Sequence, residues 1–362
     1  MEDLQMFDSI IINSRVKEFY TVNFIDDLVK QITKIANEED NVFVVDEKIS
    51  KYFATELDCV FEKSRFIIIE CKEENKTLEY SQELIRRLIE LNIRKNNRLI
   101  VIGGGIAQDI SCFIASILFR GLDWFFFPTT LLAQCDSCIG SKSSINFDQF
   151  KNLLGTFNPP SEIYIYPGFL NTLTENEIKS GIGEMLHYFL SESIEIAKEV
   201  SAQYEQILSN RTLLPYFIQH SLRIKKNIVQ IDEFDTSIRH IFNYGHTFGH
   251  AIEAISQYKI QHGQAISIGM DLANFISMSR GMISEDVFFE MHNILNKNMP
   301  KFKFDQSNIE KYILALSKDK KNKGNKLGSI LTSGPGKLSK VFLDFDDSLK
   351  NLILEYSLKF QN

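Results

Sequence analysis

An excess of basic charge, long apolar runs and a secretion signal are all missing from this sequence of 362 residues. Its formal net charge is −7 and its pI is about 5.6, which excludes a general nucleic-acid binder because such proteins need a basic surface. The longest apolar runs, such as Cys112–Phe119 and Trp124–Pro128, are too short to span a bilayer. The first fifteen residues are acidic before they are apolar and lack the basic start of a secretory signal. We therefore expect a soluble cytoplasmic protein with no nucleic-acid or membrane partner.

Cysteines are also scarce. Five of them lie scattered through the chain, which is typical of reduced thiols and not of a disulfide framework. Cys135 and Cys138 form a CxxC pair, but the second pair that a structural zinc site needs is absent. We therefore expect no metal or redox role for this pair.

The first half of the chain alternates apolar strands with helical stretches. Asn41–Asp46, Arg65–Glu70 and Arg98–Ile102 are predicted to be buried strands, and Leu84–Leu91 has the periodicity of an amphipathic helix. Strands that alternate with helices indicate a parallel sheet with a nucleotide-type crevice at the strand ends. The length of the chain favours two domains.

The second half has a different pattern. It is mostly helical from Glu175 to Lys226 and from His246 to Leu295, with Pro215 and Pro300 as breaks. The predicted fold is therefore an α/β nucleotide-binding domain over residues 1–175, followed by an all-α domain over residues 176–362.

A histidine-rich stretch, IFNYGHTFGHAIE at Ile241–Glu253, supplies candidate metal ligands. His246 and His250 are four residues apart and share one face of a helix, and His262 follows twelve residues later. Imidazole is the commonest ligand of a catalytic divalent metal, and a catalytic zinc needs three protein ligands. Each histidine could instead be an ordinary core or surface residue. A zincin protease is excluded because its motif needs glutamate where Thr247 stands.

Three glycines, Gly103 to Gly105, follow the strand Arg98–Ile102. Glycines between a strand and a helix let the backbone approach a pyrophosphate, which the helix N-terminus then binds. The segment departs from the GxGxxG fingerprint, so a simple tight turn is the alternative. The next stretch, from Phe127 to Gly155, offers hydroxyls, a carboxylate, two lysines and two amides. Such a set suits a phosphorylated, polyhydroxylated ligand, although each lysine alone could be a solvated surface residue.

Several motifs occur in one order along the chain. They are GGGxxxD at Gly103–Asp109, PTTLLAQxDS at Pro128–Ser137, GxK at Gly140–Lys142, KNLxG at Lys151–Gly155, GxxE at Gly181–Glu184, NxGHTFGHAIE at Asn243–Glu253 and HGxA at His262–Ala265. In this order they resemble the 3-dehydroquinate synthase family of sugar phosphate cyclases, from about Asp46 to Lys321. The resemblance implies a dehydroquinate synthase-like fold, with an NAD-binding α/β domain, a helical metal-binding domain, an active site in the cleft, and a homodimer.

The resemblance also implies site residues. The metal ligands, normally for zinc and otherwise for a similar ion such as cobalt, would be Glu184, His246 and His262. The NAD contacts would be Asp46, Glu73, Lys76, Gly104, Gly105, Asp109, Thr129, Thr130, Lys151 and Thr172. The substrate positions would be Asp136, Lys142, Asn152, Lys225, Arg239, Asn243 and His250. Arg120 matches an arginine that reaches the neighbouring subunit's phosphate site, and Lys320 or Lys321 matches a late phosphate-binding lysine. Lys225 and Arg239 would hold a substrate carboxylate.

The activity implied by the resemblance is a lyase reaction on an acidic sugar phosphate. NAD removes a hydride beside a metal-bound hydroxyl, phosphate is eliminated, the hydride returns, and an intramolecular aldol step closes a carbocycle. NAD is regenerated, so there is no net redox change. The implied substrate is 3-deoxy-arabino-heptulosonate 7-phosphate, the implied product is 3-dehydroquinate, and the implied pathway is the shikimate route to aromatic amino acids.

Four positions depart from the family pattern. His187 stands where the family has a lysine, and Ser141-Lys142-Ser143 replaces Gly-Lys-Thr. Gln108 stands where glycine is common, and Gln264 where glutamate is common. Two alternatives therefore remain open: a sibling cyclase that uses another acidic sugar phosphate, and a catalytically weak homologue kept as a binding or structural partner. A metal-dependent polyol dehydrogenase shares the glycine triplet, but it has no need of Lys142, Asn152 and Arg239 together.

Overall fold

The computed structural model describes residues 8–38, 40–148, 150–305, 307–319 and 321–361. The chain divides into two compact units. Unit 1 comprises residues 1–173 and 225–234, and unit 2 comprises residues 174–224 and 235–362.

The described part of unit 1 contains one seven-stranded sheet with the order β1-β2-β9-β6-β5-β3-β4. These strands are β1 (Ile10–Asn13), β2 (Phe19–Phe24), β3 (Asn41–Asp46), β4 (Arg65–Ile69), β5 (Arg98–Gly103), β6 (Asp123–Pro128) and β9 (Glu162–Ile165). Only the edge pair β1–β2 is antiparallel, and the other neighbours are parallel. The predicted parallel sheet is confirmed, and its strands at 41–46, 65–69 and 98–103 match the predicted apolar runs.

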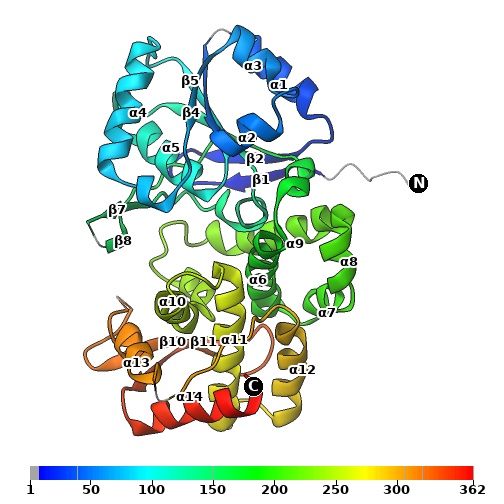
Figure 1. Cartoon of the computed structure of the whole chain (residues 1–362), viewed down its shortest axis with the longest axis vertical. Coiled ribbons are helices and arrows are strands. Elements are labelled where there is room, and N and C mark those ends of the chain that lie inside the picture. The colour runs from blue at the N-terminus through cyan, green and yellow to red at the C-terminus, as the bar shows by residue number, and fades with distance from the viewer. Residues whose placement is uncertain (1–7, 39, 149, 306, 320, 362) are drawn as a thin grey trace. The chain divides into compact units, whose positions relative to one another are not determined.

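Helices cover both faces of this sheet (Figure 1). They are α1 (Leu28–Ala36), α2 (Glu47–Tyr52), α3 (Asp58–Lys63), α4 (Leu78–Glu90) and α5 (Gly105–Ile117). Alternate strand residues, such as Phe43 and Ile100, form one core with α1, α2 and α3. The residues between them, such as Val42 and Leu99, are equally buried and face the other side. Burial on both faces explains why these strands are continuous apolar runs without alternation.

The order of the strands locates the crevice of unit 1. After β3 the chain forms β4, which lies on one side of β3. It then returns to form β5 on the other side of β3, and β6 and β9 follow outward from β5. Parallel sheets bind ligands at the carboxyl ends of strands where the direction of winding changes. Here that point lies between β3, which ends at Asp46, and β5, which ends at Gly103. The predicted glycine turn therefore lies at this point.

Shorter elements complete unit 1. They are the 3-10 turns η1 (Glu73–Asn75), η2 (Leu118–Arg120) and η4 (Pro167–Thr172), the π-helical turn η3 (Ala133–Ser137), and the antiparallel hairpin of β7 (Ile145–Phe147) and β8 (Phe150–Leu154). Residues 225–229, which form the last turn of α9 (Leu214–Val229), also belong to unit 1.

Unit 2 is mainly helical. Besides most of α9 it contains α6 (Glu175–Glu192), α7 (Glu195–Ala202), α8 (Tyr204–Ser209), η5 (Arg211–Leu213), η6 (Ile238–Asn243), α10 (His246–Ile255), α11 (His262–Ser279), α12 (Glu285–Asn296), α13 (Ile309–Ser317) and α14 (Asp347–Phe360). Pro215 lies in the first turn of α9, where a missing N–H removes no helical hydrogen bond. The antiparallel hairpin of β10 (Lys326–Thr332) and β11 (Leu338–Asp344) also belongs to this unit, in contrast to the predicted all-α domain.

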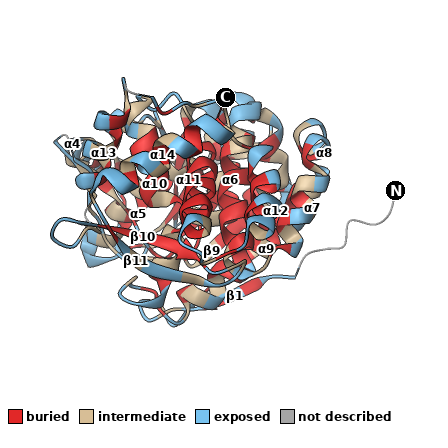
Figure 2. Cartoon of the chain, turned by 90° about the horizontal axis from the view of Figure 1, so that it is seen from below, coloured by how far each residue is buried: buried red, intermediate tan, exposed pale blue. Residues whose placement is uncertain are grey.

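α11 is the central helix of unit 2. Every residue from Gly263 to Ser277 is buried, and α6 is buried along most of its length; both helices are largely red in Figure 2. α11 packs against α6, α10, α12 and α14. No helix within the described residues is long and apolar enough to cross a membrane.

Candidate functional site

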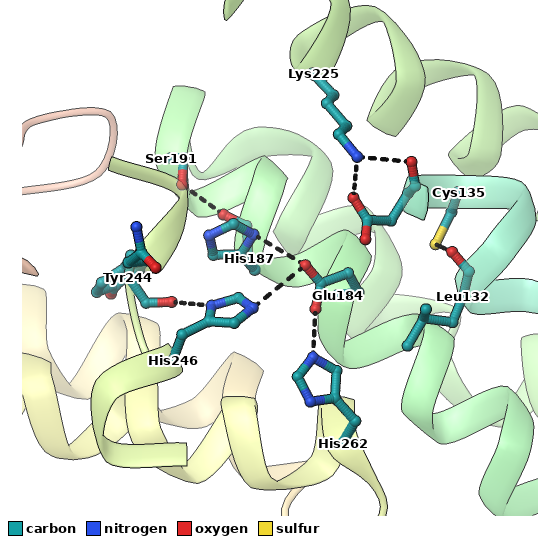
Figure 3. Close-up of polar contacts among 12 residues, drawn as sticks. Leu132, Cys135, Glu184, His187, Ser191, Lys225, Tyr244, His246 and His262 are labelled. Carbon is teal, nitrogen blue, oxygen red and sulfur yellow. Dashed lines mark hydrogen bonds and ion pairs between the residues drawn. The ribbon is translucent and has the colours of Figure 1, made fainter. Parts of the chain in front are cut away.

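The helical unit brings together residues from three helices around one carboxylate (Figure 3). Glu184 lies in the middle of α6 and is 2% exposed. His246 is the first residue of α10, and His262 is the first residue of α11. Gly245 precedes His246 with a φ of +78°, a conformation that favours glycine. The ligand candidates on α10 and α11 are thus the opening residues of two helices, directed at a carboxylate of a third.

Both histidines turn their Nε2 atoms to Glu184. Nε2 of His246 lies 3.7 Å from Oε1, and Nε2 of His262 lies 3.6 Å from Oε2. Donors about 2.0–2.2 Å from one tetrahedral zinc lie roughly 3.3–3.6 Å apart. Oε2 of Glu184 is buried and accepts no hydrogen bond from the described residues. A buried carboxylate oxygen without a hydrogen bond, faced by imidazole nitrogens, fits a divalent cation such as Zn²⁺ or Co²⁺.

His250 is close to the same centre. One ring nitrogen from each of His246, His250 and His262 lies within 4.8 Å of the other two. The ring of His250 is 5.4 Å from that of His246 and 5.7 Å from that of His262, between centroids, and His250 is exposed. The geometry therefore allows His250 to act as a ligand as well as a substrate residue.

The environment gives the two partly buried histidines opposite protonation preferences in the metal-free protein. Burial lowers the pKa of His246 well below its usual 6.5, against the opposite effect of Glu184. Burial also acts to lower the pKa of His262, but Glu184 and Glu253 outweigh it and hold that pKa well above 6.5. His246 is thus ready to bind a metal as neutral imidazole, whereas a metal at His262 has to displace a proton.

His187 lies one turn after Glu184 on α6 and is completely buried. Its Nδ1 is 3.6 Å from Oε1 of Glu184. Its ring contacts those of Tyr188, Phe242 and His246, at centroid distances of 4.8, 5.8 and 5.0 Å. His187 therefore belongs to the wall of the metal centre, packed among aromatic rings.

The glycine turn of unit 1 has the geometry of a phosphate-binding helix start. Gly104 caps α5, a helix of 13 residues, and Gly105 opens it. A Cβ on Gly104 would lie 2.9 Å from the side chain of Thr130, whereas one on Gly105 would meet nothing closer than 3.9 Å. Thr129 donates its backbone N–H to the carbonyl of Gly103. The open backbone at this helix start fits the pyrophosphate of a dinucleotide.

The other predicted NAD residues lie at several places in unit 1. Asp46 ends β3 and caps α2, accepting from the N–H of Lys48 at 2.8 Å. Lys76 donates to Asp109 at 2.8 Å and to Ser144 at 3.0 Å, and burial raises the pKa of Asp109 although Lys76 opposes this. Thr172 lies in η4 after β9, where its hydroxyl donates to the carbonyl of Phe169.

The hairpin β7–β8 carries Lys151 and Asn152. Asn146 of this hairpin donates to Glu73 at 2.9 Å and accepts from the N–H of Asn152 at 2.9 Å. Lys151 and Asn152 are both exposed. The hairpin is thus tied to η1 through Asn146, and its lysine lies at the surface of unit 1.

Of the predicted substrate residues, Asp136 and Lys225 form a direct pair. Nζ of Lys225 donates to the carboxylate of Asp136 at 2.6 Å and to its backbone carbonyl at 2.7 Å. Asp136 lies in the π-helical turn η3, a distortion that is frequent at functional sites. Lys142 is exposed on the loop after Ser141, and Ser141 contacts the buried Glu233.

The remaining predicted residues are spread over both units. In unit 2, Arg239 is buried in η6, and Asn243 ends that turn and accepts from Nζ of Lys321 at 3.4 Å. In unit 1, Arg120 is exposed in η2 with a φ of +64°. Lys320 lies outside the described residues. Lys321 thus contacts another predicted site residue.

The CxxC thiols are held away from solvent. Cys135 and Cys138 are buried in and beside η3, and burial raises the pKa of Cys138 to about 12. A protonated, buried thiol is a poor nucleophile and a poor ligand.

Comparison with known proteins decides the family. Two family models match, 3-dehydroquinate synthase N-terminal over residues 66–180 and 3-dehydroquinate synthase C-terminal over residues 181–322. The 3-dehydroquinate synthase of Thermoanaerobacter sp. (strain X514) is 31% identical over 340 residues, which cover 92% of this chain and 96% of that protein. The chain belongs to the 3-dehydroquinate synthase family. The predicted family is confirmed, and with it the lyase type of enzyme.

Further relatives agree. The 3-dehydroquinate synthase of Alkaliphilus metalliredigens (strain QYMF) is 34% identical over 313 residues, covering 85% of this chain and 88% of that protein. A solved 2-deoxy-scyllo-inosose synthase, complexed with carbaglucose-6-phosphate, NAD⁺ and Co²⁺, has a TM-score of 0.84 at 24% identity and covers 96% of this chain and 100% of its own. A 2-epi-5-epi-valiolone synthase from Streptomyces hygroscopicus subsp. jinggangensis 5008, with NAD⁺ and Zn²⁺ bound, has a TM-score of 0.83 at 22% identity, with coverages of 94% and 97%. At these identities the two structures show the fold alone, which the family shares.

Sequence reasoning missed the residues that support the site. Glu253 contacts the ring of His262, and its spacing of seven residues from His246 could have placed it on the same helix face. Gln108, at a position where the family often has glycine, exchanges two hydrogen bonds with Ser137. Glu233 accepts from Ser14 and from the N–H of Arg15, and no sequence pattern indicates those contacts.

Proposed function

We propose that this enzyme is an NAD- and metal-dependent sugar phosphate cyclase that converts 3-deoxy-arabino-heptulosonate 7-phosphate to 3-dehydroquinate, as in the shikimate pathway. The observation that carries the proposal is that Nε2 of His246 and Nε2 of His262 both face the buried carboxylate of Glu184. One oxygen of this carboxylate accepts no hydrogen bond from the described residues. The match to 3-dehydroquinate synthases over 96% of a relative's length supports it.

The cofactors follow from the two sites. Glu184, His246 and His262 would hold the divalent metal, and the glycine turn at Gly104 and Gly105 would hold the pyrophosphate of NAD. When bound, the metal makes a substrate hydroxyl more acidic, and NAD takes up and returns a hydride. The bound NAD⁺ with Co²⁺ or Zn²⁺ in the two solved cyclases supports this assignment.

The protein's own share is binding, orientation and charge. Arg239 is 7% exposed, and its planar guanidinium can bind a carboxylate bidentately. Lys225 is 5% exposed, and its ammonium has three donors, of which Asp136 takes two. Both side chains are cationic and can donate to a carboxylate, which favours a substrate that carries one. Lys142, Asn152, Lys321 and His250 would bind its phosphate and hydroxyls.

The test is phosphate release from the heptulosonate phosphate, measured with NAD and Zn²⁺ or Co²⁺ in a homogeneous preparation. We expect turnover that needs both cofactors, without steady accumulation of NADH. A ketose phosphate lacking the carboxylate serves as the matched control substrate and should react far more slowly. Steady NADH formation from a polyol would instead identify a dehydrogenase, and silence on every substrate would identify a non-catalytic homologue.

A sibling cyclase for another acidic sugar phosphate is the second candidate, and His187 is the observation that favours it. This buried imidazole replaces a lysine of the family pattern within 3.6 Å of Glu184. A lysine there would add a fixed positive charge, whereas an imidazole offers one donor and one acceptor when neutral. Faster phosphate release from a different acidic sugar phosphate in the same assay would decide for this candidate.

A homodimer forms part of the proposal. The guanidinium of Arg120 lies on an exposed turn, as needed for an arginine that serves the partner subunit's phosphate site. Sedimentation equilibrium would test the dimer. If the dimer forms, a mixture of Arg120→Ala subunits with subunits inactivated at the metal centre should show partial recovery of activity.

A further inference from the structure

The ring of His262 lies between two carboxylates. Its Nε2 is 3.6 Å from Oε2 of Glu184, and its Nδ1 is 3.2 Å from Oε2 of Glu253. His246 has a similar arrangement with a weaker partner, because its Nε2 is 3.7 Å from Glu184 and its Nδ1 is 3.2 Å from the backbone carbonyl of Tyr244. Both rings thus direct Nδ1 to an oxygen acceptor and Nε2 to the same carboxylate.

This arrangement sets the tautomer that each ring takes when it is neutral, as a metal ligand has to be. A neutral imidazole carries one N–H and one lone pair, and an oxygen acceptor at Nδ1 holds the proton there. The lone pair is then on Nε2, the atom directed at Glu184. The carboxylate of Glu253 is a stronger acceptor than the neutral carbonyl of Tyr244, since charge-assisted hydrogen bonds are roughly twice as strong.

We propose that Glu253 is a positioning residue that holds His262 in the orientation and tautomer needed to bind the divalent metal, and that makes its Nε2 a stronger donor. This inference rests on the metal assignment of the proposed function. Partners of this kind on the second ring nitrogen orient ligating histidines in other metal sites. Glu253 is well placed for this role, because its side chain is 14% exposed and it lies on α10, the helix that also carries His246.

A purely structural role for the carboxylate has little support from the contacts. Among the described residues, the hydrogen-bond and ion-pair partner of the Glu253 carboxylate is His262 alone. The end of α10 depends instead on the backbone carbonyl of Glu253, which accepts from Ser256 and from the N–H of Tyr258. A side-chain substitution leaves these backbone contacts in place, so α10 should fold normally in the variants.

The test compares Glu253→Gln and Glu253→Ala with the wild-type chain in titrations with Zn²⁺ and Co²⁺ against a competing chelator. We expect the dissociation constant to rise by about 10- to 100-fold in the alanine variant, and by less in the isosteric glutamine variant. The visible absorption of bound Co²⁺ should also change, because the orientation of one ligand ring is no longer fixed. Glu290→Gln is the matched control, since its exposed carboxylate pairs only with Lys198 in the described residues.

Each result has a defined meaning. Unchanged affinity and an unchanged Co²⁺ spectrum in both variants would overturn the role of Glu253 and leave the proposed function intact. Lower thermal stability of the metal-free alanine variant with unchanged metal affinity would overturn it too, in favour of a structural contact. A wild-type chain that binds neither ion would overturn this inference and the metal assignment together.

Discussion

A methyl group on Gly183 would lie 1.9 Å from the carbonyl oxygen of Gly263. The reverse is equally tight, because a Cβ on Gly263 would lie 1.8 Å from the carbonyl oxygen of Ser180. α6 and α11 therefore cross with their backbones in contact, as only glycine allows. Glu184 follows Gly183, and His262 precedes Gly263, so this crossing sets the spacing between a carboxylate and an imidazole of the metal centre.

Gly263→Ala should therefore damage both stability and metal binding. The new methyl group has to separate α6 from α11, which should lower the free energy of unfolding by about 1–3 kcal/mol and move His262 away from Glu184. Urea unfolding and a Zn²⁺ titration measure the two effects. Gly105→Ala is the control, because its Cβ has room. Normal metal affinity in a stably folded Gly263→Ala variant would show that the crossing does not set the ligand spacing.

Removing His246 should remove the metal without unfolding the chain. His246→Ala deletes one of the imidazoles that face Glu184, so we expect metal content to fall well below one per chain and turnover to be lost. Elemental analysis after desalting measures the first, and phosphate release the second. His220→Ala, on α9 and outside the cluster, is the control.

Chelator treatment of the wild-type chain should abolish activity, and Zn²⁺ or Co²⁺ should restore it. Full metal content with full activity in His246→Ala would refute the ligand assignment.

Much of the fold could be predicted because it depends on local patterns. The run Asn41–Asp46 forms β3 at the predicted residues, since a strand buried on both faces needs a continuous apolar sequence. The hairpin β10–β11 could not be predicted in the same way. Most of β11, Leu338–Asp344, is not buried, so its sequence has little of the hydrophobic periodicity that identifies a strand.

The candidate site could be predicted as a set of residue types, but not as a set of contacts. The spacing of His246 and His262, with the family motifs around them, was enough to propose them as ligands. The contact of Glu253 with His262 depends on how the chain turns between α10 and α11, and Lys225 meets Asp136 across 89 positions. Periodicity within one element carries no information about contacts between distant elements.

Arg239 should matter most for acidic substrates. Arg239→Ala removes a buried guanidinium, and we expect kcat/KM for the heptulosonate phosphate to fall by the equivalent of about 2–4 kcal/mol. Arg239→Lys should recover only part of this loss, since an ammonium cannot bind a carboxylate bidentately. Steady-state kinetics on the acidic substrate and on an analogue without the carboxylate provide the comparison. Equal losses on both substrates would show that Arg239 serves another purpose.

His187 gives a test that separates packing from ligation. His187→Ala empties a fully buried position between aromatic rings, so we expect the free energy of unfolding to fall by about 2–4 kcal/mol. We expect the Zn²⁺ dissociation constant to change far less than in His246→Ala, because the assigned ligands remain. Urea unfolding of the metal-free proteins and a chelator-competition titration supply the two numbers. A large loss of metal affinity at unchanged stability would make His187 a ligand.

Lys225 and Asp136, which both belong to unit 1, should have coupled effects on stability. Their side chains are only 6% and 18% exposed. A variant that removes one of the two charges therefore takes an ion-pair partner away from a charge with little access to water. Lys225→Met and Asp136→Asn should each lower the free energy of unfolding by about 1–3 kcal/mol. The double variant should lose less than the sum of the two, by about 0.5–3 kcal/mol, because the contact between the two charges is already lost in each single variant. Lys17→Met with Asp123→Asn, a more exposed pair in the same unit, is the control and should show weaker coupling. Strictly additive losses at Lys225 and Asp136 would mean that the contact between them adds nothing to stability.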